Sequence, residues 1–388
     1  MANPIGPLLP ADEQFTHQVV ETFATVGTTD PSWTEKVCAM AAARDGSLQL
    51  GFGLGKYTNR NVMDAYSGVS RGVEQMTVRA SRRLQPEPEF TVIGPIRYEV
   101  LEPLRTIRFA LDANDRQPIA FDWVFEAVVP PHVEERTHTR DNYRVSAELV
   151  RYHQTGVASG WVEVDGTRTE VTPDTWVSTR DHSWGVRYGV GVPLTDMPPP
   201  AASPISDGAS FEFLWSPILM ERPDGSRYAL WLEWSRVKAP GFGREEAHGT
   251  VEHPDGRIET VVGIAPEMTY DPANRRLRGG RITVTMADGS TRPLGVEVVS
   301  DTGFHLGAGL YFGFDGHFHG EWRGDLVVDG ERIDDCSTPE NARRLHQIRD
   351  TVIHVTDPVG GGEGWGNMQP IITGDHPALR LDGATSFM

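Results

Sequence analysis

Apolar and polar side chains alternate along many short segments of the chain. Residues 121–126 and 211–215 place an aromatic side chain at every second position, and residues 231–235 set Leu232 and Trp234 against Trp231, Glu233 and Ser235. Successive side chains of a strand point to opposite faces. A period of two therefore predicts β-strands with one buried face.

Asp-Gly pairs separate many of these segments. This dipeptide tolerates the positive φ angles of a type I′ turn, whose twist matches that of the flanking strands. We therefore predict a mainly antiparallel β protein, closed or stacked so that few edges are exposed. The pairs begin at Asp45, Asp165, Asp224, Asp255, Asp288, Asp315, Asp329 and Asp382.

Helix is expected at two places only. Residues 12–25 approximate a helical stripe, and a second helix is expected to begin at Thr338-Pro339 and to continue to Ile348. The proline-rich residues 193–204 cannot supply a regular ladder of backbone donors. We therefore expect two β domains, at residues 1–195 and 205–388.

Charge and composition narrow the class of protein. A formal net charge of −18 disfavours binding to nucleic acid or to an anionic membrane surface. No segment has the run of apolar residues that a membrane span needs. Cys38 and Cys336 are too few for a disulfide framework, and the first residues lack a secretory signal. These features predict a cytoplasmic protein.

Two motifs suggest chemistry that the pattern does not favour. Residues 51–56 are rich in glycine, but Tyr57 follows Lys56 where a P-loop has Ser or Thr, so we expect a tightly packed strand. Asp181, His182 and Ser183 are consecutive, and alternation along a strand separates His182 from both neighbours. A Ser-His-Asp hydrolase is therefore disfavoured.

Residues 317–321 suggest a metal site. In a strand His317, His319 and Glu321 would share one side, and two imidazoles with a carboxylate suit zinc or ferrous iron. A hydrogen-bonded polar stripe is the alternative. A metal-dependent enzyme that uses these three residues is therefore a further interpretation of the chain.

The richest group of chemically able side chains lies at residues 180–188, Arg-Asp-His-Ser-Trp-Gly-Val-Arg-Tyr. As a strand, this segment would place His182, Trp184 and Tyr188 on one face, and Asp181 and Arg187 on the other. The first face would line a cavity, while the second would hold the strand in register by pairing with neighbours.

Around Asp181-His182-Ser183-Trp184-Gly185 the chain resembles the lipocalin-like family that includes the carotenoid 1,2-hydratases, whose strand reads Asp-His-Asn-Trp-Gly. Residues 160–166 and 319–324 look like the same group. The resemblance implies two packed lipocalin-like β-barrels and an apolar cavity. It also implies hydration, dehydration, isomerisation or cyclisation without a redox cofactor, with roles for His182 and Trp184. Ser183 in place of Asn, and no Tyr-x-Asp pattern on the following strand, depart from the hydratases.

These observations predict a cofactor-free acid–base enzyme, of the hydratase, dehydratase, isomerase or cyclase type, that acts on a hydrophobic alkene or alcohol. An acid among His182, Glu212 and Glu233 would protonate a double bond, and Trp184 would stabilise the cation. Tyr188 would donate a hydrogen bond to substrate. The expected substrate-binding residues are Trp123, Trp215, Trp231 and Tyr311.

The main alternative is a carrier of a hydrophobic ligand, which needs few ionisable groups in its cavity. The expected partner is a hydrophobic small molecule in either case, and homodimerisation is left open.

Overall fold

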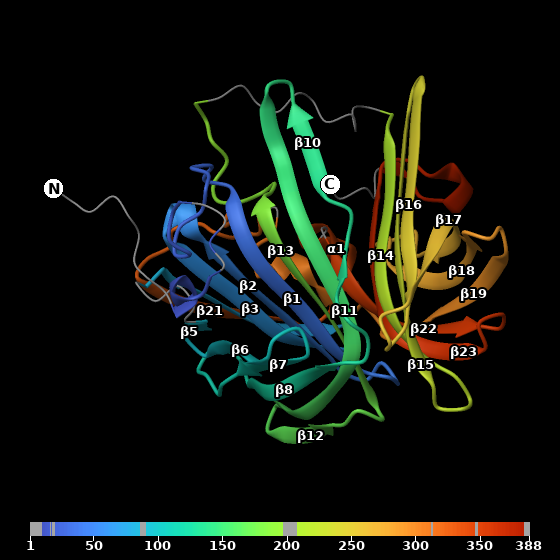
Figure 1. Ribbon diagram of the computed structural model, residues 1–388, viewed down its shortest axis with the longest axis horizontal. Helices are drawn as coiled ribbons and strands as arrows, with labels where there is room; N and C mark the ends of the chain where they lie inside the picture. The colour runs from blue at the N-terminus through green and yellow to red at the C-terminus, as the bar shows by residue number, and fades with distance from the viewer. Residues whose placement is uncertain are drawn as a thin grey trace.

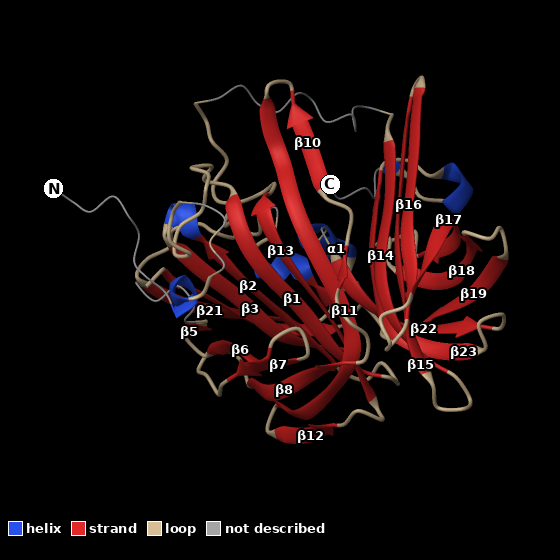
Figure 2. Cartoon of the chain, in the orientation of Figure 1, coloured by secondary structure: helices blue, strands red, loops and turns tan. Residues whose placement is uncertain are grey.

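The structure is a computed structural model that describes residues 10–15, 17, 20–85, 91–196, 208–311, 313–345 and 348–383. Two antiparallel β-sheets, each curled around its own apolar core, make up most of it (Figure 1). Strands dominate, and the helical turns are short (Figure 2). The prediction of a mainly antiparallel β protein is confirmed.

The first sheet has 14 strands in the order β21-β4-β3-β2-β1-β13-β11-β8-β7-β6-β5, with β9, β10 and β12 also paired to β11. Its strands are β1 (Trp33–Ala43), β2 (Gln49–Tyr57), β3 (Val62–Arg71), β4 (Glu74–Arg83), β5 (Val92–Ile93), β6 (Ile96–Glu102), β7 (Thr106–Leu111), β8 (Ile119–Ala127), β9 (His132–Val133), β10 (Thr137–Asp141), β11 (Arg144–Val164), β12 (Thr167–Val171), β13 (Trp176–Val186) and β21 (Leu326–Ile333).

The second sheet has nine strands, and the pairing of β19 with β22 closes it into a barrel. Consecutive hairpins from β14 to β19 give it an up-and-down order. Its strands are β14 (Ser210–Glu221), β15 (Arg227–Ala239), β16 (Phe242–Glu252), β17 (Ile258–Tyr270), β18 (Leu277–Met286), β19 (Thr291–Val298), β20 (Phe304–His305), β22 (Arg349–Asp357) and β23 (Gly362–Thr373).

Each sheet is formed by one half of the chain, except for one strand. Strand β21 comes from the second half but pairs with β4 of the first sheet. Most of the proline-rich segment lies outside the described residues, which omit 197–207. The division into domains at residues 195 and 205 therefore stays a prediction.

Five of the eight Asp-Gly pairs join consecutive strands as predicted, whereas Asp329-Gly330 lies inside β21. Among these five hairpins only Asp165-Gly166 has positive φ at both residues, 51° and 77°. In the other four only the glycine is left-handed, so the expected type I′ geometry is wrong there. An L-residue such as Asp adopts positive φ at a cost that these turns avoid.

The glycine-rich residues 51–56 lie in β2, and the expectation of a tightly packed strand is confirmed. Phe52 and Leu54 point into the first core, so the three glycines face the opposite side. A Cβ at Gly51 would lie 2.6 Å from the Phe304 ring, and one at Gly53 would lie 2.3 Å from the Tyr66 ring. Aromatic side chains therefore rest directly on this backbone.

Helix α1 (Pro339–Arg344) begins as predicted, because the Thr338 hydroxyl accepts a hydrogen bond from the Asn341 N–H at 3.2 Å. It ends before Ile348, and residues 346–347 are not described. The predicted helix at residues 12–25 is wrong over the part that the structure describes. Only the 3₁₀ turn η1 (Pro10–Glu13) overlaps it; the others are η2 (Thr58–Arg60), η3 (Leu306–Gly309) and η4 (Pro377–Leu379).

Candidate functional site

Strand β13 separates two chemically different spaces. His182 and Arg180 face the interior of the first sheet, where Arg180 lies over the Phe125 ring. Thr179 and Asp181 face the second sheet, and the Thr179 hydroxyl donates to Asn367 of β23 at 2.6 Å. Alternation along β13 thus places His182 and Asp181 in different sites, as predicted, although both faces carry ionisable groups.

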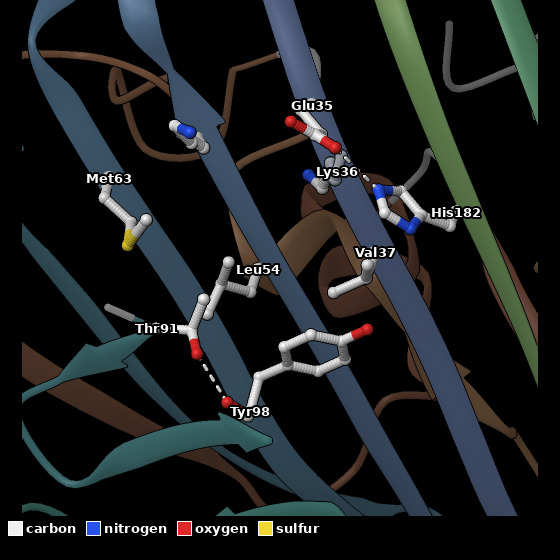
Figure 3. Close-up of a pocket in the computed structure, with 9 residues that line it drawn as sticks. Glu35, Lys36, Val37, Leu54, Met63, Thr91, Tyr98 and His182 are labelled. Atoms are coloured by element: carbon white, nitrogen blue, oxygen red, sulfur yellow. Dashed lines mark hydrogen bonds and ion pairs between the residues drawn. The ribbon is translucent and has the colours of Figure 1, made fainter. Parts of the chain in front are cut away.

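On the His182 face, a cavity of about 210 Å³ lies where β1 begins and β2 and β13 end. Val37, Leu54 and Met63 form its apolar wall (Figure 3). His182 Nε2 lies 3.1 Å from Glu35 Oε1, and its Nδ1 lies 3.2 Å from the Tyr152 hydroxyl. The hydrogen bond with His182 lowers the pKa of Glu35, against the effect of burial.

On the opposite face, Asp181 is half-buried between the two sheets. Its carboxylate forms no direct hydrogen bond or ion pair with any other described residue. Burial raises its pKa, and nearby Arg151 and Arg187 only partly offset this. A carboxyl that keeps its proton readily and has no fixed partner can exchange that proton with a ligand.

Three residues surround Asp181 on the first-sheet side. Cys38 is its direct partner across β1 and β13, and the Cys38 thiol lies 2.9 Å from the Tyr311 hydroxyl. Lys36 is two positions before Cys38 on the same face, and its Nζ lies 3.7 Å from the centre of the Tyr311 ring. We call Lys36, Cys38, Arg151, Asp181 and Tyr311 the inter-sheet site.

Tyr311 also contacts a buried polar network of the first sheet. The Tyr57 hydroxyl donates to Asp64 Oδ1 at 3.0 Å and lies 2.8 Å from His319 Nδ1. The His319 ring stacks on Tyr311 with a centroid distance of 5.4 Å. Burial lowers the pKa of His319 well below its usual range, so this ring is neutral. The network holds Tyr311 against Lys36 and Cys38.

The expected strand at residues 317–321, and with it the shared face of the proposed metal ligands, is wrong. The segment forms turns, which leave His317 exposed beside Glu321 and bury His319 against Tyr57. Within the part of the chain that the structure describes, no three His, Cys, Asp or Glu side chains are grouped to hold a metal ion. These residues do not fit the expected ligand set.

A charged network joins the two sheets beside Asp181. His153 of β11 is fully buried; its Nδ1 lies 3.0 Å from Glu134 Oε1 and its Nε2 lies 2.8 Å from Glu252 Oε1 of β16. Burial lowers the pKa of His153, but the two carboxylates overcome this and raise it to about 9. Glu134 also pairs with Arg151 and accepts the Trp215 Nε1–H at 3.0 Å.

The structure brings three further predicted residues to this interface. Trp215, Trp231 and Glu233 share one face of β14 and β15; Trp231 stacks on His153, and Glu233 pairs with Arg151 at 3.1 Å. Burial raises the pKa of Glu233 above its usual range. Glu233 is therefore a second carboxyl that can hold a proton near Asp181.

Other predicted residues lie elsewhere. Glu212 points to the opposite face of β14 from Trp215, where bonds with His376 and Arg236 overcome burial and lower its pKa. Trp123 is fully buried in the first core and stacks on Phe109 at 4.4 Å.

The expectation that Tyr188 shares the His182 face is wrong, because β13 ends at Val186. Tyr188 is 52% exposed, and its hydroxyl contacts Thr139 and Ser146. Trp184 does remain beside His182, with a centroid distance of 5.8 Å. Arg187 donates a hydrogen bond to the Ser183 hydroxyl at 2.7 Å. The expectation that Asp181 also pairs with neighbours is wrong, because it has no direct partner among the described residues.

Gly185 ends the motif for a geometric reason. Its φ is +135°, and a Cβ there would lie 2.0 Å from the Glu148 carbonyl oxygen. Gly185→Ala is therefore expected to destabilise the protein by about 2 kcal/mol or more. Urea unfolding would measure this, with Gly27→Ala as the control because nothing lies within 4 Å of its Cβ position. Equal stability of the two variants would contradict the account.

Several residues of the site were not predicted. Glu134, Arg151 and His153 lie on segments whose partners are far away in sequence. Lys36 did carry a signal, since it directly precedes the largely apolar run 37–43 and is one of only three lysines in the chain. A lysine entering a buried strand is unusual enough to mark a candidate site.

The fold and the interface define a class of protein: two curled antiparallel β-sheets with a layer of charged and aromatic side chains between them. Residues 8–380 match the family described as "Family of unknown function (DUF8625)", and the chain belongs to that family. No curated protein matches its sequence. No helix among the described residues is long and apolar enough to cross a membrane.

Solved structures of similar fold include an AttH-like protein from Nitrosomonas europaea. It has a TM-score of 0.51 and 11% identity, over 95% of this chain and 99% of that one. This likeness supports the lipocalin-like fold expected from the sequence. CghA bound to Sch210972 has a TM-score of 0.45 and 12% identity, over 88% of each chain. Kievitone hydratase from Nectria haematococca has a TM-score of 0.39 and 10% identity, over 95% and 98%.

Proposed function

We propose that this protein is an acid–base enzyme that adds or removes water, or moves a double bond, on a hydrophobic small molecule held at the inter-sheet site. The observation that carries the proposal is the half-buried carboxyl of Asp181, which has no direct partner among the described residues and a raised pKa. In this proposal the proton-transfer role moves from His182 to Asp181. His182 is already engaged by Glu35 and Tyr152.

The surroundings of Asp181 support proton transfer because they are fixed. Arg151 is tied to both Glu134 and Glu233, and Cys38 is tied to Tyr311. These groups hold their positions as the charge on Asp181 changes, which is what electrostatic preorganisation requires. Trp215, Trp231 and Tyr311 supply aromatic surface for a hydrophobic ligand.

The charge of the site also selects the kind of intermediate. Arg151 and Arg187 both place positive charge near Asp181. Arg151 lies over the Trp215 ring at 5.5 Å, so that ring already faces a cation. Such surroundings stabilise an oxyanion or enolate better than the carbocation expected from the sequence.

The alternative function, a carrier, is disfavoured by the ionisable groups on both faces of β13. A carrier gains nothing from burying Asp181, Glu233 and Lys36, each of which costs desolvation free energy. On the other face, His182 has a carboxylate within 3.1 Å rather than apolar contacts alone.

Mass spectrometry of the small molecule that co-purifies with the native protein is the first test. That compound, returned to the protein in H₂¹⁸O, should gain ¹⁸O by addition of water or lose a hydroxyl. In D₂O it should gain deuterium on carbon if the reaction moves a double bond. A compound that binds but stays chemically unchanged in both solvents would show a carrier instead.

A further inference from the structure

Lys36 is a buried amine that the proposed proton transfer at Asp181 does not use. It is 2% exposed, and it forms no direct hydrogen bond or ion pair with another described residue. The chain has 36 lysine and arginine residues, of which only Lys36, Lys56 and Lys238 are lysines. A cation that only balanced charge could be arginine, which is less costly to bury and stays protonated.

The groups that face Lys36 come from several elements. Cys38 lies beside it on β1, Asp64 and Tyr66 on β3, and Asp181 on β13; the charged Arg187 and the neutral His319 are also close enough to interact with it. The Tyr311 ring covers its Nζ at 3.7 Å. Burial is the largest influence and, with Arg187, outweighs the nearby acids, which lowers the pKa of Lys36 to about 8. A sizeable fraction of the amine is therefore neutral near physiological pH.

We propose that Lys36 is a nucleophile that forms an imine with the carbonyl carbon of an α,β-unsaturated aldehyde or ketone, and so sets the substrate class of the inter-sheet site. The choice of a conjugated substrate rests on the proposed function, while the imine chemistry rests on the position of Lys36 itself. A neutral amine, a nearby carboxyl and aromatic walls are what carbonyl capture needs.

The reaction balances without any further reactant. Lys36 Nζ attacks the carbonyl carbon, the C=O bond breaks, and water leaves with a proton from Asp181 to give a protonated imine. A water then adds to the β-carbon, gives its proton to the Asp181 carboxylate, and leaves an enamine. Asp181 returns that proton to the α-carbon, and hydrolysis of the imine frees Lys36 and the β-hydroxy carbonyl product. The reverse sequence is a dehydration.

Carbonyl capture is tested by trapping the imine. The whole protein is incubated at pH 7.5 with benzaldehyde or, separately, butanal, and sodium cyanoborohydride, and the modified lysines are mapped by peptide mass spectrometry. Neither probe has a conjugated aliphatic double bond that would alkylate Cys38. At this pH about a quarter of Lys36 is neutral, against about a thousandth of an ordinary lysine. We expect Lys36 to be labelled at least roughly tenfold faster than the exposed Lys238.

Two variants complete the test. Lys36→Arg should abolish labelling at this position and keep the charge, whereas Lys238→Arg should leave Lys36 labelled as before; thermal unfolding checks that both are folded. The proposal would be overturned if the exposed lysines were labelled and Lys36 were modified by neither probe in the folded protein. A third result separates the two proposals: the imine is trapped at Lys36, but the Asp181→Asn variant turns over substrate as fast as the natural protein. This result would refute the proposed role of Asp181 and would still support the amine chemistry of Lys36.

Discussion

Asp181→Asn is expected to lower kcat on the co-purifying compound by about 10²–10⁴-fold, the usual contribution of a positioned acid or base. Asn has nearly the same shape but cannot hold or release the proton. Because Asp181 has no direct partner among the described residues, the substitution breaks no ion pair. The melting temperature should therefore stay the same or rise, and steady-state kinetics with calorimetry would measure both effects.

Asp122→Asn is the matched control. Asp122 is a partly buried aspartate of the same sheet, on β8, and it pairs with Arg108 of β7, which is not part of the inter-sheet site. The Asp122→Asn variant should keep the turnover of the natural protein. The pH profile of kcat/KM for the natural protein should also show an inflection above the usual aspartate range, since burial raises the pKa of Asp181. A profile unchanged in Asp181→Asn would argue against this group.

His153→Leu is expected to have the largest effect on stability. The substitution leaves Glu134 and Glu252 buried without the imidazolium between them, and the loss of one member of such a group typically costs about 3–5 kcal/mol. Chemical denaturation would measure the loss. In the double variant His153→Leu/Glu252→Leu much of it should return, because one stranded carboxylate is removed as well. A double variant no more stable than the single one would mean that lost packing, not stranded charge, is the cause.

The same histidine predicts the pH dependence of stability. Its pKa of about 9 in the folded protein lies above the value of about 6.5 in the unfolded chain. Its contribution is therefore complete below about pH 6.5 and is lost as the pH rises through 9, by on the order of 3 kcal/mol. Unfolding free energies measured across this range should decline in the natural protein, and His153→Leu should lack that part of the decline.

The fold was readable from the sequence because its signals are local. Alternating aromatics at residues 121–126 and 211–215 lie in β8 and β14, and five Asp-Gly pairs form the hairpins they predict. The closure of the second sheet through β19 and β22, and the exchange of β21, depend on pairings far apart in sequence. No local pattern encodes those pairings.

The site could be predicted only in part from the sequence, for the same reason. Alternation correctly separated His182 from Asp181, but it could not show which face the second sheet would cover. The covering residues, Trp215 and Glu233, lie on strands of the other sheet, and His153 acquires its carboxylates only when the two sheets meet. Tyr188 was misplaced because no signal marked the end of β13 at Val186.

A crystal structure of the protein with its co-purifying compound would show whether the inter-sheet site binds the substrate. We expect ligand density between the two sheets, with a reacting atom within hydrogen-bond distance of the Asp181 carboxyl and aromatic contact to Tyr311 or Trp215. Density confined to the cavity beside His182 and Glu35, with the space around Asp181 closed to the ligand, would contradict this expectation.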